Sequence, residues 1–269
     1  MSRPWDAERA VSIGLARGLL ARQFPELAGE RVEPFGVGWD NSAFLVGGEW
    51  VFRFPRRKLA AALIEREIAI LPRVAPGLPL PVPVPTFAGR PAAGYPWPFA
   101  GYRRLPGAAA CRARLDAAGR QRAARPLARF LAALHATGAI DGPRPWLPIL
   151  EDLPADFVPR ARALVHGDLY ARHVLVDARG APSGVIDWGD VHAGEPAVDL
   201  SLAHAFLPDR ARGAFRDAYG PIDEPTWRMA RFRALHSVVH FLRYGCEVGD
   251  AALVDEGRTA LAHLAGYSI

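Results

Sequence analysis

Acids and histidines gather in two neighbouring stretches of the chain, VHGDLYARHVLVD and GVIDWGD. The first contains His166, Asp168 and His173, and the second contains Asp187. Phosphoryl transfer from a nucleotide needs a carboxylate that takes or orients the hydroxyl proton, ligands for magnesium and a cation on the phosphates. The two stretches can supply the carboxylate and the ligands.

Short apolar runs beside these residues are predicted to form strands. ALV at 163–165, VLV at 174–176 and GVI at 184–186 have the length and composition of strands. DARG at 177–180 separates the last two runs and is typical of a turn. We therefore expect a hairpin whose open end presents the acids and histidines.

Helices are predicted around this hairpin. One is expected to begin at Pro126 and to end at Gly138. From Pro196 onward the apolar spacing is again helical. The core residues predicted in this last part are Trp227, Phe232, Leu235, Val239 and Leu242.

The amino-terminal part of the chain predicts a small antiparallel sheet over residues 31–54. SAFLV and EWVFRF flank Gly47 and Gly48, and glycines readily supply the positive φ angles of a tight hairpin turn. A helix is expected around EREIAIL, followed by an extended run over 76–85, where prolines repeat. Residues 96–107 predict a strand that passes into a connector.

The polar motifs resemble those of protein kinases. HGDLYARH keeps the His, Asp and Leu of the kinase signature HRDLxxxN, with Gly167 in place of Arg and His173 in place of Asn. IDW resembles DFG, with Trp188 as the aromatic residue. With GEPAVDLSLA, these motifs occur in order and resemble the aminoglycoside phosphotransferase family, small-molecule kinases that share the protein-kinase fold. WDNSAFLV, EWVFRFPRR and EREIAIL resemble the amino-terminal lobe of that family.

This resemblance implies an α+β chain with a bilobal, protein-kinase-like fold. Residues 1–102 would form a nucleotide-binding lobe with a small antiparallel sheet. Residues 103–269 would form a mainly helical lobe that carries the catalytic hairpin and binds the acceptor. The implied reaction moves the γ-phosphate of ATP or GTP to a hydroxyl of a small molecule.

The resemblance also assigns roles to single residues. Asp168 resembles the catalytic base and Asp187 a metal ligand, with His173 beside it in the metal region. Glu67 resembles the helix acid that holds the phosphate-binding cation. That cation is a lysine in the family pattern and Arg53 here, which keeps the charge and offers a planar fork to phosphate oxygens.

Further residues are expected around the nucleotide and the acceptor. Ser42, in FGVGWDNSA, would lie in the loop over the phosphates. The backbone from Arg103 to Leu105 would bind the adenine or guanine base. Asp190 and Glu195 either contact the acceptor or belong to a solvated loop.

The metal is expected to be Mg²⁺, with Mn²⁺ as an alternative because of His173. Magnesium is a hard cation that prefers oxygen, whereas imidazole suits softer metals. The macrolide phosphotransferase branch, which this chain resembles at HGDLxxxH, carries the same histidine. The acceptor stays open between an aminoglycoside-like antibiotic, a macrolide-like antibiotic and a related metabolite.

Simpler roles are expected for several other residues. His166 is predicted to brace the catalytic loop, and the resemblance gives Asp199 the role of holding that loop. His236 and His240, one helical turn apart, are interpreted as partly buried packing residues rather than metal ligands.

Two other functions remain open at this point. The first is an impaired kinase-like protein that binds nucleotide without turnover. The second is a metallohydrolase using His166, Asp168, His173, Asp187 and His192, although the HxH and HExxH spacings that bring two imidazoles to one metal are missing.

Composition limits the partners and the compartment. The chain has 269 residues and a formal charge of +5, but the charge is scattered and almost all arginine, with Lys58 the only lysine. We therefore expect no nucleic-acid partner. Cys111 and Cys246 lack zinc or disulfide-framework spacing, which favours a reducing cytoplasm. No apolar run reaches membrane-spanning length, so no membrane association is expected.

Overall fold

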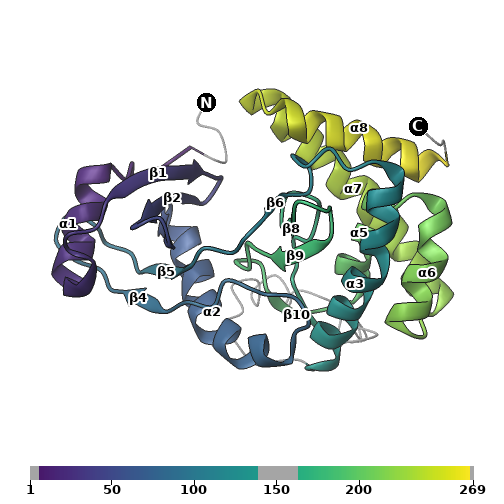
Figure 1. Cartoon of the computed structure of the whole chain (residues 1–269), viewed down its shortest axis with the longest axis horizontal. Helices are drawn as coiled ribbons and strands as arrows, with labels where there is room; N and C mark the ends of the chain where they lie inside the picture. The colour runs from purple at the N-terminus through teal and green to yellow at the C-terminus, as the bar shows by residue number, and fades with distance from the viewer. Residues whose placement is uncertain (1–5, 139–162, 267–269) are drawn as a thin grey trace, which may run out of the picture. The chain divides into compact units, whose positions relative to one another are not determined.

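The protein forms two compact units in this computed structural model, which describes residues 6–138 and 163–266 (Figure 1). The first unit comprises the described residues up to Ala75 together with Pro83–Arg104. The second comprises Pro76–Val82 and the described residues from Leu105 onward. The amino-terminal antiparallel sheet and the mainly helical remainder agree with the predicted fold class.

The first unit contains one five-stranded antiparallel sheet in the order β1-β2-β3-β5-β4. Its strands are β1 (Val32–Val37), β2 (Asn41–Val46), β3 (Trp50–Pro55), β4 (Phe87–Gly89) and β5 (Phe99–Arg103). The helices are α1 (Ile13–Gln23), the 3-10 turn η1 (Pro25–Leu27) and α2 (Lys58–Val74), which is followed by the 3-10 turn η2 (Ala75–Gly77). The predicted hairpin turn joins β2 to β3, and Gly47 and Gly48 adopt positive φ angles of 59° and 74°.

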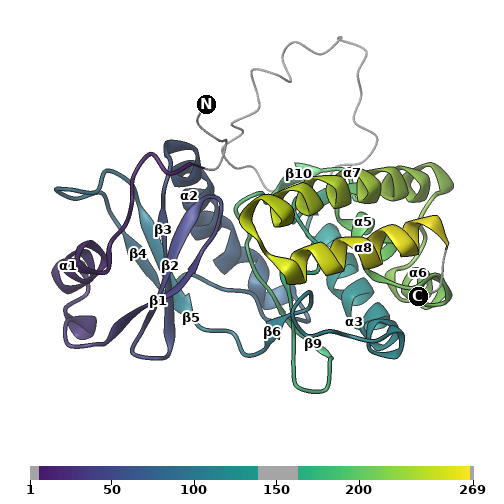
Figure 2. The same cartoon turned by 90° about the horizontal axis from the view of Figure 1, so that it is seen from above.

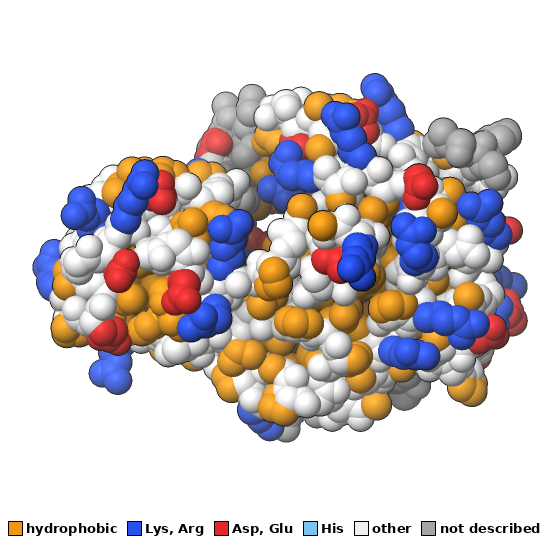
Figure 3. All heavy atoms as spheres, viewed as in Figure 1, with side chains coloured by type: hydrophobic (Ala, Val, Ile, Leu, Met, Phe, Trp, Pro, Cys, Tyr) orange, Lys and Arg blue, Asp and Glu red, His pale blue; other side chains and the backbone are white. Residues whose placement is uncertain are grey.

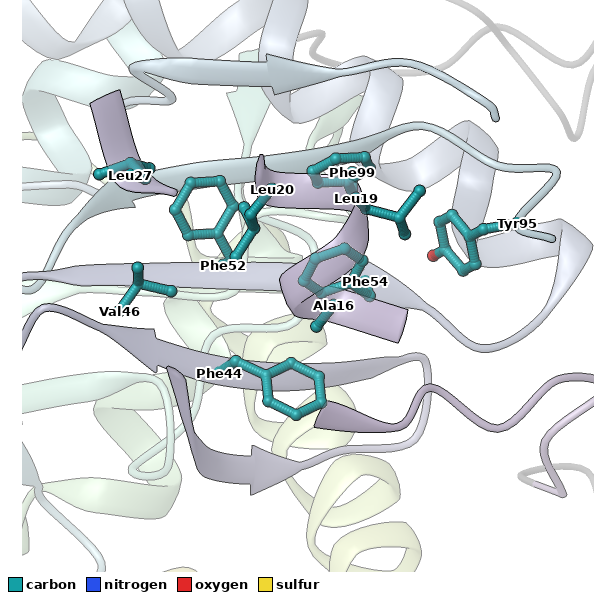
Figure 4. Packing of buried hydrophobic residues seen from close by; sticks show 10 residues of the cluster. All are labelled: Ala16, Leu19, Leu20, Leu27, Phe44, Val46, Phe52, Phe54, Tyr95 and Phe99. Carbon is teal, nitrogen blue, oxygen red and sulfur yellow. The ribbon is translucent and has the colours of Figure 1, made fainter. Parts of the chain in front are cut away.

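Side-chain alternation along β3 gives the sheet two different faces. Phe52 and Phe54 point into an aromatic core with Phe99, and the rings of Phe54 and Phe99 stack at 4.6 Å (Figure 4). Helix α1 covers this core with Leu19 and Leu20. Because successive side chains of a strand point to opposite faces, Arg53 is directed away from the aromatic core. The sheet thereby presents a buried cation to α2.

The second unit combines two small sheets with long helices (Figure 2). One sheet has the order β6-β8-β9 and the other pairs β10 with β7. The strands are β6 (Ala108–Ala109), β7 (Ala163–Val165), β8 (Val174–Val176), β9 (Pro182–Val185) and β10 (His192–Gly194). The helices are α3 (Ala117–Ala136), α5 (Ala197–Phe206), α6 (Asp209–Tyr219), α7 (Glu224–Val248) and α8 (Ala251–Ala265). Strands β8 and β9 form the predicted hairpin.

The start of α3 differs from the prediction. The helix begins after Asp116, whose side chain accepts a hydrogen bond from the amide of Gly119 at 2.6 Å, and Pro126 lies inside it. A proline inside a helix removes one backbone hydrogen bond, and the packing of Ala123, Ala124 and the other buried residues of this face against the core outweighs that loss. The predicted end is confirmed, because Gly138 follows the helix with a φ of 75°.

The core prediction for this last part of the chain is wrong at three of its five residues, whereas Trp227 and Leu242 are half-buried and Leu242 packs against the buried cluster. Phe232, Leu235 and Val239 are exposed, with 63%, 47% and 53% of their surface accessible. The buried face is made mainly of small residues: Ala230, Ala234, Val238, Phe241 and Gly245. Small side chains let the neighbouring helices approach closely, since a Cβ on Gly257 of α8 would lie 2.3 Å from the side chain of Leu242. Close helix packing therefore selects the small face of α7.

Charged side chains are spread over the surface shown in Figure 3, where basic side chains lie among acidic and apolar ones. No helix in the two described ranges is long and apolar enough to cross a bilayer.

Candidate active site

The loop between β7 and β8 is held by a buried carboxylate. Asp199 of α5 accepts hydrogen bonds from the amides of His166 at 2.7 Å and Gly167 at 3.0 Å. Nε2 of His135 lies 3.2 Å from the same carboxylate. Burial raises the pKa of Asp199, but the hydrogen bond and charge of His135 and the contacts with His166 outweigh it, so the pKa is lowered. Asp199 thus has the loop-holding position predicted for it.

Gly167 occupies a place in this loop that suits glycine alone. Its φ is +91°, a conformation that L side chains rarely adopt. A Cβ at this position would lie 2.3 Å from the backbone oxygen of Asp190. The replacement of the kinase arginine by glycine therefore lets two backbone segments of the site come close together.

His166 braces the loop against the strand that precedes Asp187. Its Nε2 lies 3.0 Å from the backbone oxygen of Ile186 and donates to it, and Nδ1 accepts from the amide of Asp168 at 3.3 Å. Burial lowers the pKa of His166 to about 4, so the ring is neutral near pH 7. These contacts agree with the bracing role predicted from the sequence.

Asp168 lies on the loop between β7 and β8 with about half of its side chain accessible, at 51%. Its carboxylate stands in a partly desolvated environment, which raises its pKa. The negative charges of Asp190 and Asp187 also raise the pKa of Asp168, whereas His173 lowers it. The resulting pKa of Asp168 is about 7. A carboxylate with this pKa has the basicity of a general base near neutral pH.

His173 lies between the two acids. Its Nδ1 donates to the backbone oxygen of Asp168 at 2.7 Å, and Nε2 lies 3.2 Å from Oδ2 of Asp187. Burial lowers the pKa of the ring, but the charge and hydrogen bond of Asp187 outweigh it and the pKa is raised. The bond to the carbonyl orients the ring so that Nε2 faces Asp187.

Asp187 has an unusual backbone conformation, with a φ of 67°. Left-handed backbone in a residue other than glycine is uncommon and concentrates at functional sites. The residues on either side hold it: the amide of Ile186 donates to the oxygen of His173 at 2.9 Å, and the buried Trp188 donates from Nε1 to the oxygen of Val185 at 3.0 Å. The ring of Trp188 packs against that of His166 at 4.8 Å.

Nε2 of His173 and Oδ2 of Asp187 form a hydrogen-bonded pair here, and they would become donors to a divalent cation only once Nε2 has lost its proton. Two adjacent ligands about 2.1 Å from an octahedral ion lie about 3 Å apart, close to the 3.2 Å between Nε2 and Oδ2. Among the described residues, histidines, cysteines and acids do not form a group of three or more able to hold a metal ion. Magnesium in phosphate sites commonly uses one or two protein carboxylates, so Asp187 fits this pattern and the nitrogen of His173 departs from it.

In the first unit, Arg53 and Glu67 form the ion pair that the resemblance implies. Nη1 of Arg53 donates to Oε1 of Glu67 at 2.7 Å and to Oε2 at 2.9 Å. Only 8% and 2% of the surfaces of these residues are accessible. Because a buried charge is stable only with a partner, β3 and α2 hold the arginine in one position.

The other predicted nucleotide-binding residues lie on this sheet or just after it. Ser42 is buried in β2, paired with Val37 and Phe54, and so lies in a strand rather than in the loop where it was expected. The amide of Arg104 donates to the oxygen of Glu49 at 2.7 Å. Since hydrogen bonds alternate along an antiparallel pair, Arg103 turns its own amide and carbonyl away from β3.

The predicted acceptor residues are near the loop but differ in exposure. Asp190 is exposed and its charge acts on Asp168, whereas Glu195 is half-buried between β10 and α5. Other acids of the helical unit already have partners. Asp223 and Asp250 cap α7 and α8, Glu224 pairs with Arg216 at 2.8 Å, and Glu247 pairs with Arg243 at 2.8 Å.

Sequence reasoning missed Tyr170. Its ring stacks on Phe241 of α7 at 5.2 Å and meets the ring of His173 edge-on at 4.5 Å. The guanidinium of Arg172, two residues later, lies 5.7 Å from the ring centre of Tyr244. An aromatic residue between Asp168 and His173 was the available signal, and its ring packs α7 against the loop between β7 and β8.

His236 and His240 are exposed, which corrects the prediction that they are partly buried. Their rings lie 4.3 Å apart, and Nδ1 of His240 donates to the backbone oxygen of His236 at 3.1 Å. Neither histidine belongs to a three-ligand group within the described part of the chain.

Comparison with known proteins gives a family and a fold. The model of the phosphotransferase enzyme family matches residues 31–163 and 149–233. A curated relative, the uncharacterized protein YcbJ of Bacillus subtilis (strain 168), is 28% identical over 69 residues, 26% of this chain. That match spans 22% of the relative's length.

Solved structures with the same fold are phosphotransferases. The GDP complex of aminoglycoside 2'-phosphotransferase-IIIa has a TM-score of 0.68 at 23% identity, covering 95% of this chain and 99% of that one. The macrolide 2'-phosphotransferase MphH from Brachybacterium faecium has a TM-score of 0.59 at 24% identity, covering 94% and 99%. At these identities the likeness establishes the fold.

Proposed function

The chain belongs to the phosphotransferase enzyme family, and on this basis we propose that it transfers the γ-phosphate of ATP or GTP to a hydroxyl group of a small molecule. The observation that carries this proposal is the arrangement of Asp168, His173 and Asp187 on one braced loop system. The related fold of structures solved with GDP or ATP supports a nucleotide as co-substrate.

Asp168 is the proposed catalytic base. Its half-exposed carboxylate can accept a hydrogen bond from the acceptor hydroxyl, and a pKa near 7 lets it take the proton as the oxygen attacks phosphorus. His166 and Asp199 hold the backbone on which this carboxylate stands. Proton transfer therefore starts from a preset geometry.

Asp187 and His173 are the proposed ligands of Mg²⁺, or of Mn²⁺. When bound there, the cation would neutralise negative charge on the nucleotide phosphates. The chain's own contribution is orientation: the carbonyl of Asp168 fixes the His173 ring, and Ile186 and Trp188 hold Asp187 in its left-handed conformation. The nitrogen ligand is what makes manganese an alternative.

Arg53 is the proposed cation for the phosphates, with Glu67 fixing its position. The backbone at Arg103 and Leu105 is proposed to bind the nucleotide base, and Ser42 to lie by the phosphates. Asp190 and Glu195 are proposed acceptor contacts. The two cysteines are free, Cys111 buried and Cys246 exposed, which suits a reducing compartment such as the cytoplasm.

The acceptor is proposed to be a hydroxylated small molecule of the aminoglycoside or macrolide type, or a related metabolite. The similar structures include one described with gentamicin and a macrolide phosphotransferase. A polycationic acceptor would need acids around the site. Asp190 and Glu195 are the acids proposed for this role.

The direct test is a coupled assay of nucleoside diphosphate release. ATP and GTP are each offered with aminoglycosides, macrolides, amino alcohols and sugars, with either metal, and Asp168→Asn serves as the matched control. Acceptor-dependent release by the wild type alone supports the proposal. Nucleotide binding with no turnover on any acceptor would instead identify an impaired, kinase-like nucleotide-binding protein.

A further inference from the structure

The turn between β1 and β2 is held from outside by two consecutive arginines. This turn spans Gly38–Asn41 and is closed by a hydrogen bond from the amide of Gly38 to the oxygen of Asn41 at 2.9 Å. It contains Trp39, 38% of whose surface is accessible. Arg56 and Arg57 follow the end of β3, in the motif FPRR.

Arg56 binds the backbone of the turn in two places. Its Nη1 donates to the oxygen of Gly38 at 2.8 Å, and its own amide donates to the oxygen of Asp40 at 2.7 Å. The first and third residues of the turn are therefore both fixed by one arginine.

Arg57 binds the side chain of Asp40. Its Nε donates to Oδ1 at 3.1 Å, and Nη2 contacts the same oxygen. The pair is largely shielded from water, since 16% of the arginine side chain and 27% of the aspartate side chain are accessible. A charge-assisted bond in such a place is stronger than an exposed ion pair.

We propose that Arg56 and Arg57 are positioning residues that hold the Gly38–Asn41 turn in the shape that receives the nucleotide phosphates. This inference rests on the proposed function. The turn is next to Ser42, in the segment FGVGWDNSA that the sequence assigns to the phosphates. Arg57 acts through Asp40, and Arg56 acts on the backbone, so the turn is already ordered before nucleotide binds.

Pre-ordering has a measurable consequence for affinity. If the turn were not held by the arginines, the nucleotide would have to order it on binding. Fixing the backbone of one residue costs conformational entropy, which weakens binding about tenfold. The acceptor should be affected little, because the arginines act on the nucleotide side.

The test uses the full chain with Arg57→Ala and the charge exchange Asp40→Arg/Arg57→Asp. Arg31→Ala is the matched control, since it removes the arginine of an exposed pair with Glu33 in the same sheet. Hydrogen exchange at 38–41 is measured without nucleotide, and the Kd for ATP and GTP by calorimetry. The KM for the acceptor is measured alongside.

We expect Arg57→Ala to raise exchange at 38–41 about tenfold or more and to weaken nucleotide binding about tenfold, with the acceptor KM within twofold of the wild type. The charge exchange should recover part of both losses, and Arg31→Ala should change neither. Should Arg57→Ala fail to fold, Arg57→Lys keeps the charge, loses the planar fork and is expected to show a smaller change in the same direction.

Unchanged exchange at 38–41 in Arg57→Ala would overturn the idea that the arginine holds the turn. Faster exchange with an unchanged nucleotide Kd would overturn its role in nucleotide binding. A wild type that binds neither ATP nor GTP would refute the proposed function, and the exchange data would still decide whether Arg57 holds the turn.

Discussion

Nε2 of His173 lies 3.2 Å from Oδ2 of Asp187, and the opposite ring nitrogen lies 2.7 Å from the backbone oxygen of Asp168. One imidazole therefore connects the proposed base segment to the proposed metal ligand. Its ring cannot turn without breaking the bond to the carbonyl. The histidine that departs from the common kinase pattern is thus a structural bridge as well as a proposed ligand.

Gly167→Ala should damage both folding and catalysis. The φ of +91° and the 2.3 Å approach to the oxygen of Asp190 leave no room for a Cβ. Strained backbone of this kind costs about 1–3 kcal/mol per residue, and we expect at least that loss in unfolding free energy. Urea denaturation measures it, with Gly29→Ala as control because a Cβ there meets nothing within 4 Å. Equal stability of the two variants would refute the steric argument.

His204 should make stability depend on pH. Burial and the charge of Arg212 lower its pKa from 6.5 to about 4. The unfolded chain therefore binds the proton more readily than the folded one, so stability is full above pH 6.5 and falls as the pH drops toward 4. The shift corresponds to about 3 kcal/mol.

The measurement is urea unfolding of wild type and His204→Gln at pH 7.5 and pH 5. The glutamine can still donate to the oxygen of Trp227, which accepts from His204 at 3.2 Å. We expect a smaller pH dependence in this variant, whereas His240→Gln, at an exposed position, should keep the wild-type dependence. Parallel pH curves for all three proteins would contradict the assignment.

The spatial grouping of the candidate site residues was predictable because these residues belong to short, contiguous motifs. Asp168, His173 and Asp187 come together through local contacts across one hairpin and its flanking loops. The need for Gly167 was not predictable, since it depends on the backbone of Asp190, which approaches only in the folded chain.

The core residues of α7 were predicted incorrectly for a different physical reason. Its sequence carries large apolar residues on one face and mainly small ones on another, and hydrophobicity alone favours the large ones as core. Helices that pack closely need small side chains between them, so Ala230 and Ala234 are buried while Phe232 is exposed. The distance between neighbouring helices decides which face of α7 is buried, and this distance cannot be predicted from the sequence of one helix.

Asp168→Asn should abolish transfer while leaving nucleotide affinity nearly unchanged. The carboxylate acts on the acceptor hydroxyl, and its loss should reduce kcat on the order of a hundredfold or more. The check combines steady-state kinetics with calorimetric nucleotide titration. Near-normal turnover would remove Asp168 from its assigned role, and a large loss of nucleotide affinity would mean that it acts on the nucleotide instead.

Asp187→Ala should weaken metal-dependent nucleotide binding. The anionic ligand is lost, so affinity for the nucleotide should depend little on magnesium in this variant. Titration of nucleotide with and without the metal tests this directly. Asp190→Ala is a suitable comparison, because it removes a nearby negative charge that is not one of the proposed metal ligands. A magnesium requirement that is the same in Asp187→Ala and wild type would argue against the assignment.

His173→Asn should preserve activity and shift the metal preference toward magnesium. Asparagine offers an oxygen donor, which magnesium prefers, whereas imidazole tolerates manganese well. The same change removes the ring that bonds to the oxygen of Asp168 and faces Asp187, so some stability should be lost. Activity is measured with Mg²⁺ and Mn²⁺ in parallel, and the ratio of the two rates is compared between variant and wild type.

His173→Leu is the matched control, because it fills similar space but offers neither ligand nor hydrogen bond, and it should lose activity with both metals. A ratio that stays the same in His173→Asn, with activity retained, would show that His173 does not reach the metal and serves only to orient the loop.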